Sequence, residues 1–405
     1  MNSARTLNAR EALSTLYVMP FQRTSNDTIL LHFICVIAHQ IVDGLTTFRW
    51  AGKIAEILNM DGNELDEMLG NLFTNEHELR ARLPLAQEAF YPLRSQNKAR
   101  ERWHWLLTRV LRHVRHPPPA AFQNPLRRQK PLAEARPLPP TYRDVLDYSQ
   151  TPPLNSGRIS GDLYGRSVQN MRKLCKEAGF SIGSGLFTLV SMAMMEMEER
   201  RNPGESPNGS CMLAFSDGVT LPFLPHDLDF VGRFKLLGRL AHRQLRQYQK
   251  RKRSLEEEIH LGSRSPSQLI PALFCSTTER MENRADAEAK AGINVQGSLP
   301  AKASPSLATC GISSVGDISV LMTAPKVDLS NLGGKDLVAE FKGISSLVRP
   351  RDGEFLVGAY GDSKHLSFGV SYDANAIDPA KAEEWKMVME SLLDRDLFAV
   401  TQAKL

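Results

Sequence analysis

The stretch that decides the fold is Thr28-Ile-Leu-Leu-His-Phe-Ile-Cys-Val-Ile-Ala-His39-Gln-Ile-Val-Asp43-Gly44. Residues 28–38 are an almost unbroken apolar run rich in β-branched side chains, which predicts a strand buried on both faces at the centre of a sheet. The apolar residues that follow recur at helical spacing, at Phe48, Ala51, Ile54, Ala55 and Leu58. The order is therefore strand, tight turn and amphipathic helix.

The turn itself carries the pattern H-x-x-x-D-G, in which His39 is a candidate general base. A histidine with a pKa of about 6.5 is largely neutral near pH 7 and can take a proton from a hydroxyl or an amine. Asp43 is placed to hold the turn through a charged hydrogen bond, and Gly44 permits a backbone angle or a close approach that a side chain forbids. The alternative is that His39 is a hydrogen-bonded core histidine at a strand end.

Composition bounds the rest of the chain. Its 405 residues are 42% hydrophobic, enough for one large two-lobed domain or two domains, and 50 basic against 45 acidic residues give a formal charge of +5. Such a small excess suits an anionic cofactor without requiring nucleic acid. The cysteines are widely spaced and odd in number, which predicts neither a disulfide framework nor a metal site: Cys35, Cys175, Cys211, Cys275 and Cys310.

Elements of both kinds follow along the chain. Residues 61–115 are predicted to be mostly helical, and residues 167–199 to form two helices interrupted at Gly179, the second with a methionine-rich core stripe. A strand is expected at 211–215, then a proline-rich loop and a basic helix from 239 onwards. Strands are expected at 310–318, 354–359 and 365–372, and a last helix begins at Asp378-Pro379.

Prolines crowd residues 116–158 and disfavour helix interiors and central strands. We therefore predict an N-terminal lobe at 1–115 with the H-x-x-x-D-G motif, an interlobe linker at 116–158 and a C-terminal lobe at 159–405. Because strands and helices alternate in both halves, the predicted fold class is α/β (α+β).

The segment LLHFICVIAHQIVDGLTTFRW resembles the strand, H-x-x-x-D-G turn and helix of the superfamily of chloramphenicol acetyltransferase, peptide-synthetase condensation domains and plant-type acyltransferases. KLCKEAGFSIGSGLFTLVSMAM looks like a second-lobe segment of that family, and CGISSVGDI is similar to a strand of fungal and yeast alcohol acetyltransferases. HLSFGVSYDANAIDPAKAEEWKMVMESLL resembles the family's final strand and helix. The resemblance is patchy from about residue 28 to 393 and is closest to fungal secondary-metabolite O-acyltransferases of the trichothecene type.

The resemblance implies two chloramphenicol-acetyltransferase-like lobes with a tunnel between them that meets His39. It implies His39 as the base, Asp43 as a loop-holding ion-pair partner of an unidentified arginine, and Ser313 or Ser314 in the oxyanion or acceptor pocket. Acyl-CoA, in the first place acetyl-CoA, is the implied co-substrate and a small-molecule alcohol the acceptor. No permanently bound cofactor and no metal are expected, and we expect a cytoplasmic monomer.

Two departures from the pattern of this family leave alternatives open. The plant-type motif D-F-G-W-G is replaced by Asp229-Phe-Val-Gly-Arg-Phe234, and only 38 residues precede His39, so we expect the N-terminal lobe to be incomplete. The chain could instead be a truncated or degenerate non-catalytic relative, or could act on a carrier protein as condensation domains do.

The basic run 242–253 could contact the phosphates of coenzyme A, although such a run is more often a solvated helix face. Its KRKR has no interleaved aromatic platform, which disfavours nucleic acid. The chain has no phosphate-binding loop, dinucleotide fingerprint or H-E-x-x-H. It also has no run of about 18 apolar residues, so we expect no membrane partner.

Overall fold

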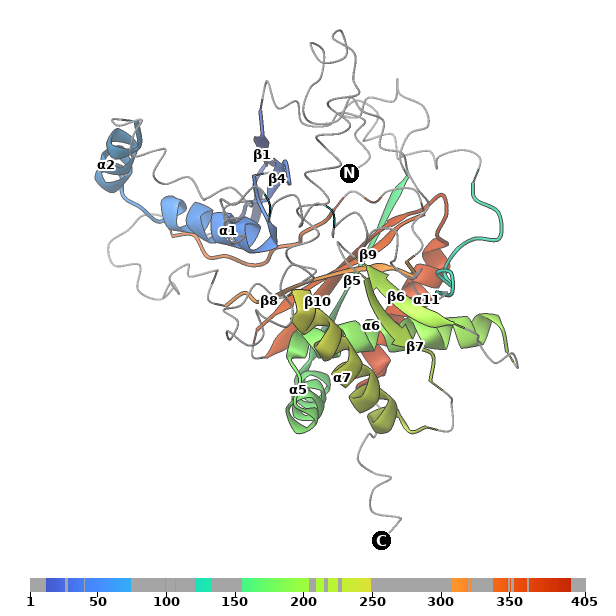
Figure 1. Cartoon of the computed structure of the whole chain (residues 1–405). Helices are drawn as coiled ribbons and strands as arrows, with labels where there is room; N and C mark the ends of the chain where they lie inside the picture. The colour runs from blue at the N-terminus through green and yellow to red at the C-terminus, as the bar shows by residue number, and fades with distance from the viewer. Residues whose placement is uncertain are drawn as a thin grey trace.

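The fold is mixed α/β. The computed structural model describes residues 12–25, 28–39, 41–73, 99, 106, 121–132, 155–203, 209–214, 218–224, 228–248, 308–319, 321, 338–348, 350, 353–362 and 364–394. Figure 1 shows a large unit built mainly from residues after 155 and a smaller N-terminal part that stands above its sheet.

The centre of the large unit is a four-stranded sheet in the order β5-β10-β9-β8. Its strands are β5 (Ser156–Tyr164), β8 (Gly311–Asp317), β9 (Phe355–Gly361) and β10 (His365–Asp373). β10 pairs antiparallel with both β5 and β9, whereas β8 runs parallel to β9 with a register shift between Ser314 and Gly316. The predictions of strands at 310–318, 354–359 and 365–372 are confirmed.

One face of this sheet is covered by α5 (Gly165–Ala178), α6 (Ile182–Arg201) and α11 (Pro379–Ser391). Every second residue of β9 is buried, which is the alternation expected of a strand with one face on the core. The largest buried side chain of α11, Trp385, meets Phe355 and Phe368 edge-on at centroid distances of 5.1 and 5.9 Å. The residue before α11, Asp378, caps it by accepting from the Ala380 N–H, as the Asp-Pro signal predicted.

The predicted break between two helices is also confirmed. Gly179 ends α5 in the left-handed conformation, with φ 74° and ψ 34°, which glycine adopts without steric cost. Ser181 then caps α6, whose methionines at 192, 194, 195 and 197 are buried. The methionine stripe is core, as expected. α6 lies between the sheet and α7 (Phe230–Tyr248), so it is enclosed on nearly all sides.

Two predictions in this region need correction. The segment after the strand at 211–215, expected to be a proline-rich loop, contains β7 (Gly218–Pro222), which pairs antiparallel with β6 (Ser210–Ala214). Helix α7 begins at Phe230 rather than at 239, because the Asp229 carboxylate accepts from the Gly232 N–H at 2.7 Å and starts the helix there. The faint echo of D-F-G-W-G is therefore a helix N-terminus.

Part of the predicted interlobe linker belongs to the core. Phe122 and Leu126 are buried, and the Phe122 N–H donates to the Ser210 carbonyl at 3.1 Å. The Asn124 side chain accepts from the Leu126 N–H at 2.9 Å and closes a tight turn. Within the predicted linker, residues 116–120 and 133–154 lie outside the described residues, as does nearly all of 74–115.

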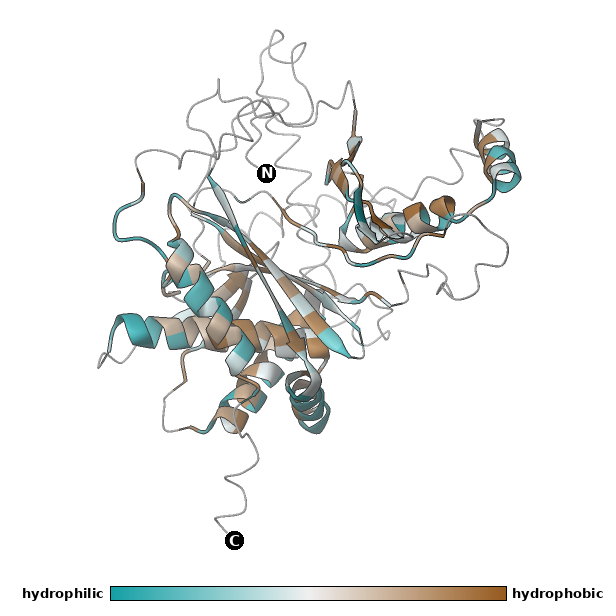
Figure 2. Cartoon of the chain, turned by 180° about the vertical axis from the view of Figure 1, so that it is seen from behind, coloured by the Kyte–Doolittle hydropathy of each residue, from teal (hydrophilic) through white to brown (hydrophobic). Residues whose placement is uncertain are grey.

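The N-terminal part consists of β1 (Ser14–Val18), β2 (Gln22–Ser25), β3 (Thr28–Leu30), β4 (Phe33–Ile37), α1 (Gly44–Leu58) and α2 (Gly62–Phe73). The helix predicted from Phe48 onwards is confirmed as α1, whose buried residues are Phe48, Gly52 and Ala55. The prediction that residues 28–38 form one central strand buried on both faces is wrong. The run divides into β3 and β4, β4 pairs with β1 alone, and most of its side chains are exposed. Figure 2 shows these hydrophobic strands apart from the main core.

Within the described part of the chain, no single helix is long and apolar enough to cross a bilayer. The helices α5 and α6 reach the required length and composition only as a pair, and that pair is bent by 111°.

We predict that Trp385→Ala lowers the free energy of unfolding by about 3–5 kcal/mol, because it empties the space between Phe355 and Phe368. Urea unfolding followed by circular dichroism measures the change. Met387→Ala, on the exposed side of the same helix with 60% of its surface accessible, is the matched control and should change stability by less than about 0.5 kcal/mol. Equal effects of the two variants would contradict this packing.

Candidate active site

His39 lies in the turn that links β4 to α1. The turn is closed by a hydrogen bond of 3.1 Å from the Ile41 N–H to the Ala38 carbonyl. The His39 side chain is exposed, and no hydrogen bond to it is found among the described residues. This differs from the alternative of a buried, hydrogen-bonded core histidine. The ring is therefore accessible to a reacting group.

Asp43 fixes the C-terminal end of this turn by capping α1. Its backbone is extended, with φ −102° and ψ −179°, and its carboxylate accepts from the Thr46 N–H at 2.8 Å and from the Thr46 hydroxyl at 2.7 Å. These hydrogen bonds, with a smaller contribution from the charge of His39, lower the pKa of Asp43 although partial burial opposes them. No arginine pairs with Asp43 in the described part of the chain. The implied ion pair stays a prediction.

Gly44 brings the turn against the sheet of the large unit. A Cβ atom placed on Gly44 would lie 3.0 Å from Val315 Cγ2, closer than such atoms normally approach. Val315 belongs to β8, and it follows Ser313, which is half-buried, and Ser314, which is exposed. The glycine of the motif thus lets the start of α1 rest on the strand that carries both predicted serines.

The same strand also reaches the start of α6. A Cβ atom on Gly183 would lie 3.7 Å from the Ser314 hydroxyl oxygen. Three segments far apart in sequence therefore meet through β8: the H-x-x-x-D-G turn, Ser314, and the N-terminus of α6. A site between two parts of the chain requires such a meeting point. Asp43 caps α1 and Gly44 allows the close approach to β8, and together they hold the turn there.

A hydrogen-bonded chain at the start of α6 was not predicted from the sequence. The Ser184 hydroxyl lies 2.9 Å from the Ser181 hydroxyl and 3.0 Å from Nδ1 of His242 on α7. Burial, and then the charge of Arg246, lower the pKa of His242, which favours the neutral ring. His242 had been assigned to a basic run, but it faces inward while Arg243 and Arg246 are exposed. A serine directly before the apolar helix was the available signal for the cap, whereas no local pattern indicates the bond to His242.

Helix α1 is anchored above the face of the sheet opposite α5, α6 and α11. Phe48, fully buried, packs against Tyr360 of β9 at a centroid distance of 4.9 Å. The Tyr360 hydroxyl donates to the Ile344 carbonyl at 2.6 Å. At the far end of α1, the Asn59 side chain donates to the Ala339 carbonyl at 2.9 Å and accepts from its N–H at 2.8 Å. The extended segment 338–348 thus ties α1 to the sheet.

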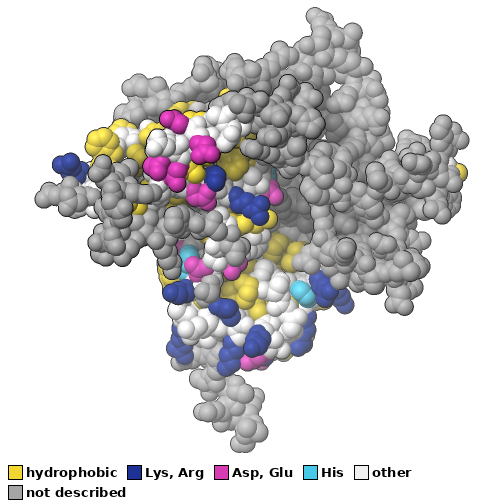
Figure 3. Space-filling model, turned by 90° about the vertical axis from the view of Figure 1, so that its left-hand side faces the viewer, with side chains coloured by type: hydrophobic (Ala, Val, Ile, Leu, Met, Phe, Trp, Pro, Cys, Tyr) yellow, Lys and Arg dark blue, Asp and Glu magenta, His cyan; other side chains and the backbone are white. Residues whose placement is uncertain are grey.

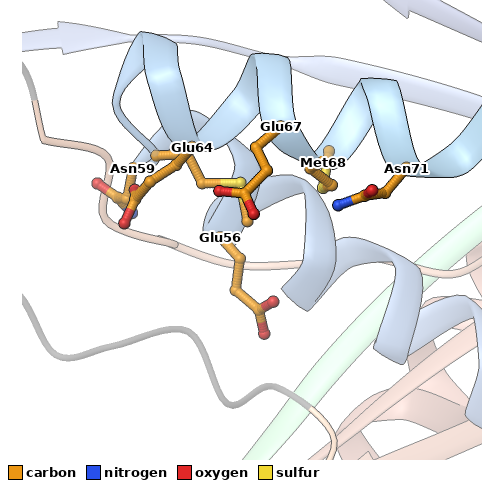
Figure 4. Close-up of a pocket in the computed structure, with 7 residues that line it drawn as sticks. Glu56, Asn59, Glu64, Glu67, Met68 and Asn71 are labelled. Carbon is orange, nitrogen blue, oxygen red and sulfur yellow. The ribbon is translucent and has the colours of Figure 1, made fainter.

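A hollow of about 500 Å³ lies between α1 and α2, away from His39. Figure 4 shows carboxylates and amides from both helices around it, with methionines between them. Its lining residues are Glu56, Asn59, Met60, Glu64, Glu67, Met68 and Asn71. Figure 3 shows acidic side chains gathered on this side of the molecule.

No group of three or more His, Cys, Asp or Glu side chains suited to a metal ion is found among the described residues. The predicted tunnel to His39 stays a prediction.

Comparison with known proteins gives structural matches only. No protein-family model matches the chain, and no curated protein does. The condensation domain of the monacolin K polyketide synthase MokA aligns with a TM-score of 0.41 at 12% identity, covering 91% of this chain and 70% of that chain. The trichothecene 15-O-acetyltransferase TRI3 from Fusarium sporotrichioides aligns with a TM-score of 0.45 at 10% identity, covering 94% and 70%.

The wax ester synthase/diacylglycerol acyltransferase from Marinobacter aquaeolei VT8 aligns with a TM-score of 0.40 at 10% identity, covering 96% of this chain and 72% of that chain. The matched structures are condensation domains and acyltransferases, the class that the H-x-x-x-D-G segment resembles. At these identities and TM-scores they establish no activity for this chain.

We predict that Asp43→Ala lowers the free energy of unfolding by about 1 kcal/mol, because the first N–H groups of α1 lose their acceptor. Asp43→Asn keeps an acceptor oxygen and should lower the free energy of unfolding by less. The pKa of Asp43 is lowered in the folded protein, so its charge stabilises the fold above the ordinary value of 3.8 and this contribution is lost as the pH falls below it. Urea unfolding of the three proteins at pH 7 and pH 3 tests both statements. A wild-type advantage over Asp43→Asn that grows at pH 3 would contradict the assignment.

We also predict that Gly44 and Val315 are energetically coupled. In Gly44→Ala the new methyl group presses on Val315, whereas Val315→Ala makes room for it. The double variant should therefore be more stable than the sum of the two single changes predicts, by about 1 kcal/mol. Additive effects within about 0.3–0.5 kcal/mol would mean that the turn and β8 do not touch.

Proposed function

We propose that this protein is an acyltransferase that moves an acyl group from a thioester to the hydroxyl of a small molecule, with His39 as general base. The observation that carries the proposal is the placement of an accessible His39 on a capped turn whose glycine rests on β8. The resemblance of residues 30–50 to H-x-x-x-D-G acyltransferases supports it independently. Acyl-CoA, in the first place acetyl-CoA, is the co-substrate that this resemblance favours.

The chemistry needs one base and two positioned substrates. An imidazole nitrogen of His39 takes the proton of the acceptor hydroxyl as its oxygen bonds to the thioester carbonyl carbon. The carbonyl oxygen becomes an oxyanion, the C–S bond then breaks, and the leaving thiolate receives the proton from the imidazolium. No covalent acyl-enzyme forms, so no serine or cysteine nucleophile is required.

The other predicted residues take supporting roles in this proposal. Asp43 and Gly44 hold the turn rather than touch substrate, since the carboxylate of Asp43 is occupied by Thr46. Ser314 is the side chain we assign to the oxyanion or the acceptor pocket, because its hydroxyl is exposed on β8 between the turn and α6. Ser313, half-buried next to it, is the second choice.

We expect His39→Ala to lower kcat/KM for acyl transfer by about 10²–10⁴-fold, the usual contribution of a positioned general base. Release of coenzyme A thiol from acetyl-CoA, with a panel of terpenoid and polyketide alcohols as acceptors, is the measurement. His32→Ala is the matched control, since His32 is an exposed histidine between β3 and β4, and it should keep full activity. Unchanged circular dichroism spectra would exclude unfolding as the cause.

Two other outcomes have different meanings. Activity that survives in His39→Ala would overturn the assignment of the base. Absence of thiol release in the wild type, with acetyl-CoA and with acyl groups on a carrier protein, would favour a non-catalytic relative that keeps the fold for binding.

A further inference from the structure

Three side chains from two helices form one hydrogen-bonded chain at the start of α6. The Ser181 hydroxyl lies 2.9 Å from the Ser184 hydroxyl, which lies 3.0 Å from Nδ1 of His242. Ser181 is exposed, Ser184 is buried and His242 is half-buried. The chain therefore runs from the surface into the contact between α6 and α7, which cross in Figure 1. We call these three residues the serine relay.

Capping of α6 does not account for the whole relay. A cap needs one side-chain acceptor, and Ser181 supplies it by accepting from the Ser184 N–H at 3.2 Å. A hydroxyl inside a helix usually bonds a carbonyl one turn earlier, as Thr188 does with the Ser184 carbonyl at 2.9 Å. The Ser184 hydroxyl instead lies between two side-chain atoms, one of them on His242 of another helix. This is the position of a proton carrier between Ser181 and a base.

The relay gives the Ser181 proton a way out. Burial, and then the charge of Arg246, lower the pKa of His242, which favours the neutral ring. When that ring carries its proton on Nε2, Nδ1 accepts from Ser184, and the Ser184 oxygen can accept from Ser181. A serine hydroxyl becomes a nucleophile when a neighbouring base removes its proton. Ser181 meets this condition through one intermediate hydroxyl, and it is the exposed member of the relay.

The space next to Ser181 accepts a small acyl group. Gly183 lies in the first turn of α6, and a Cβ atom placed on it would lie 3.9 Å from Ser181 Oγ and 3.7 Å from Ser314 Oγ. Both are ordinary van der Waals distances, so a methyl group fits there beside the two hydroxyls. Ser314 is exposed on β8, and its hydroxyl can donate to the oxygen of a carbonyl group that meets Ser181.

The sequence around Ser181 has the spacing of a known nucleophile pattern. Gly179-Phe-Ser-Ile-Gly183 fits G-x-S-x-G, in which the central serine of many hydrolases attacks the substrate. In those enzymes the serine lies between a strand and a helix, whereas Ser181 lies between α5 and α6. The relay, rather than the pattern, therefore indicates the nucleophile.

We propose that Ser181 hydrolyses esters or thioesters of short acyl groups through an acyl-serine. Ser181 Oγ bonds to the carbonyl carbon while its proton passes to Ser184 and the Ser184 proton passes to Nδ1 of His242. The bond to the alcohol or thiol breaks, and that leaving group receives the proton from His242. Water then attacks the acyl-serine, releases a carboxylic acid and restores the Ser181 hydroxyl. This activity does not depend on the proposed acyl transfer at His39.

A fluorophosphonate probe tests the nucleophile directly, because an activated serine oxygen displaces fluoride and stays bound to phosphorus. We expect the full chain to be labelled at Ser181, located by fragmentation of the tryptic peptide 177–200, and Ser181→Ala to stay unlabelled. His242→Asn keeps an oxygen that accepts from Ser184 but cannot take up a proton, and it should slow labelling by about 10²–10⁴-fold. Ser160→Ala, at an exposed serine of β5, is the matched control and should be labelled at the wild-type rate.

Three further variants separate proton transfer from a purely structural role. Ser184→Ala should slow labelling as much as His242→Asn does, and Ser184→Thr, which keeps the hydroxyl, should restore at least part of the rate. Gly183→Ala fills the space next to Ser181 and should slow labelling while leaving the circular dichroism spectrum unchanged, since a helix accepts alanine readily.

Hydrolysis of p-nitrophenyl acetate by the same proteins tests turnover, and its rates should follow the order of the labelling rates. Four results would overturn the proposal: a folded wild type that is not labelled, equal labelling of the wild type and His242→Asn, labelling without hydrolysis, or loss of labelling in His39→Ala. The last result would mean that His39, and not His242, activates the serine.

Discussion

The burial of α6 is the constraint on which the large unit depends. This helix lies against the sheet on one side and α7 on the other, so nearly all of residues 184–195 are buried, and charged side chains begin only at Glu196. A helix enclosed in this way can start and end only where its free backbone groups find partners. Ser181 at its start and Gly179 before it meet that requirement, and they fix where the α6 N-terminus lies relative to β8.

Much of the large unit is predictable from the sequence, where local signals agree with burial, but β5, β7 and the first turns of α7 are not predicted. The Gly179 break, the Asp378-Pro379 start and the strands at 311–373 were all found. The prediction failed where an apolar pattern does not show which other segment covers it. Residues 28–38 look like a central strand, yet β4 has one neighbour, because hydrophobicity records a tendency to be buried and not the partner.

In the candidate site, too, local features are predictable from the sequence and contacts between distant residues are not. The H-x-x-x-D-G turn was visible as a motif, and Asp43 has the local hydrogen bonds expected of a residue four positions after the histidine. The contact of Gly44 with Val315, and the link from Ser184 to His242, join residues 58 or more positions apart. No periodicity connects such distant positions, so the sequence shows His242 only as part of a basic run and not its hydrogen bond to Ser184.

The exposure of β4 bears directly on the chemistry of His39. Hydrogen-bond donors stabilise an oxyanion far better in a site that excludes water than in one open to it, because a low dielectric strengthens each interaction. His39 follows β4 by two residues, and both are exposed. His39 as general base would therefore act with full effect only where bound substrates exclude water from the turn.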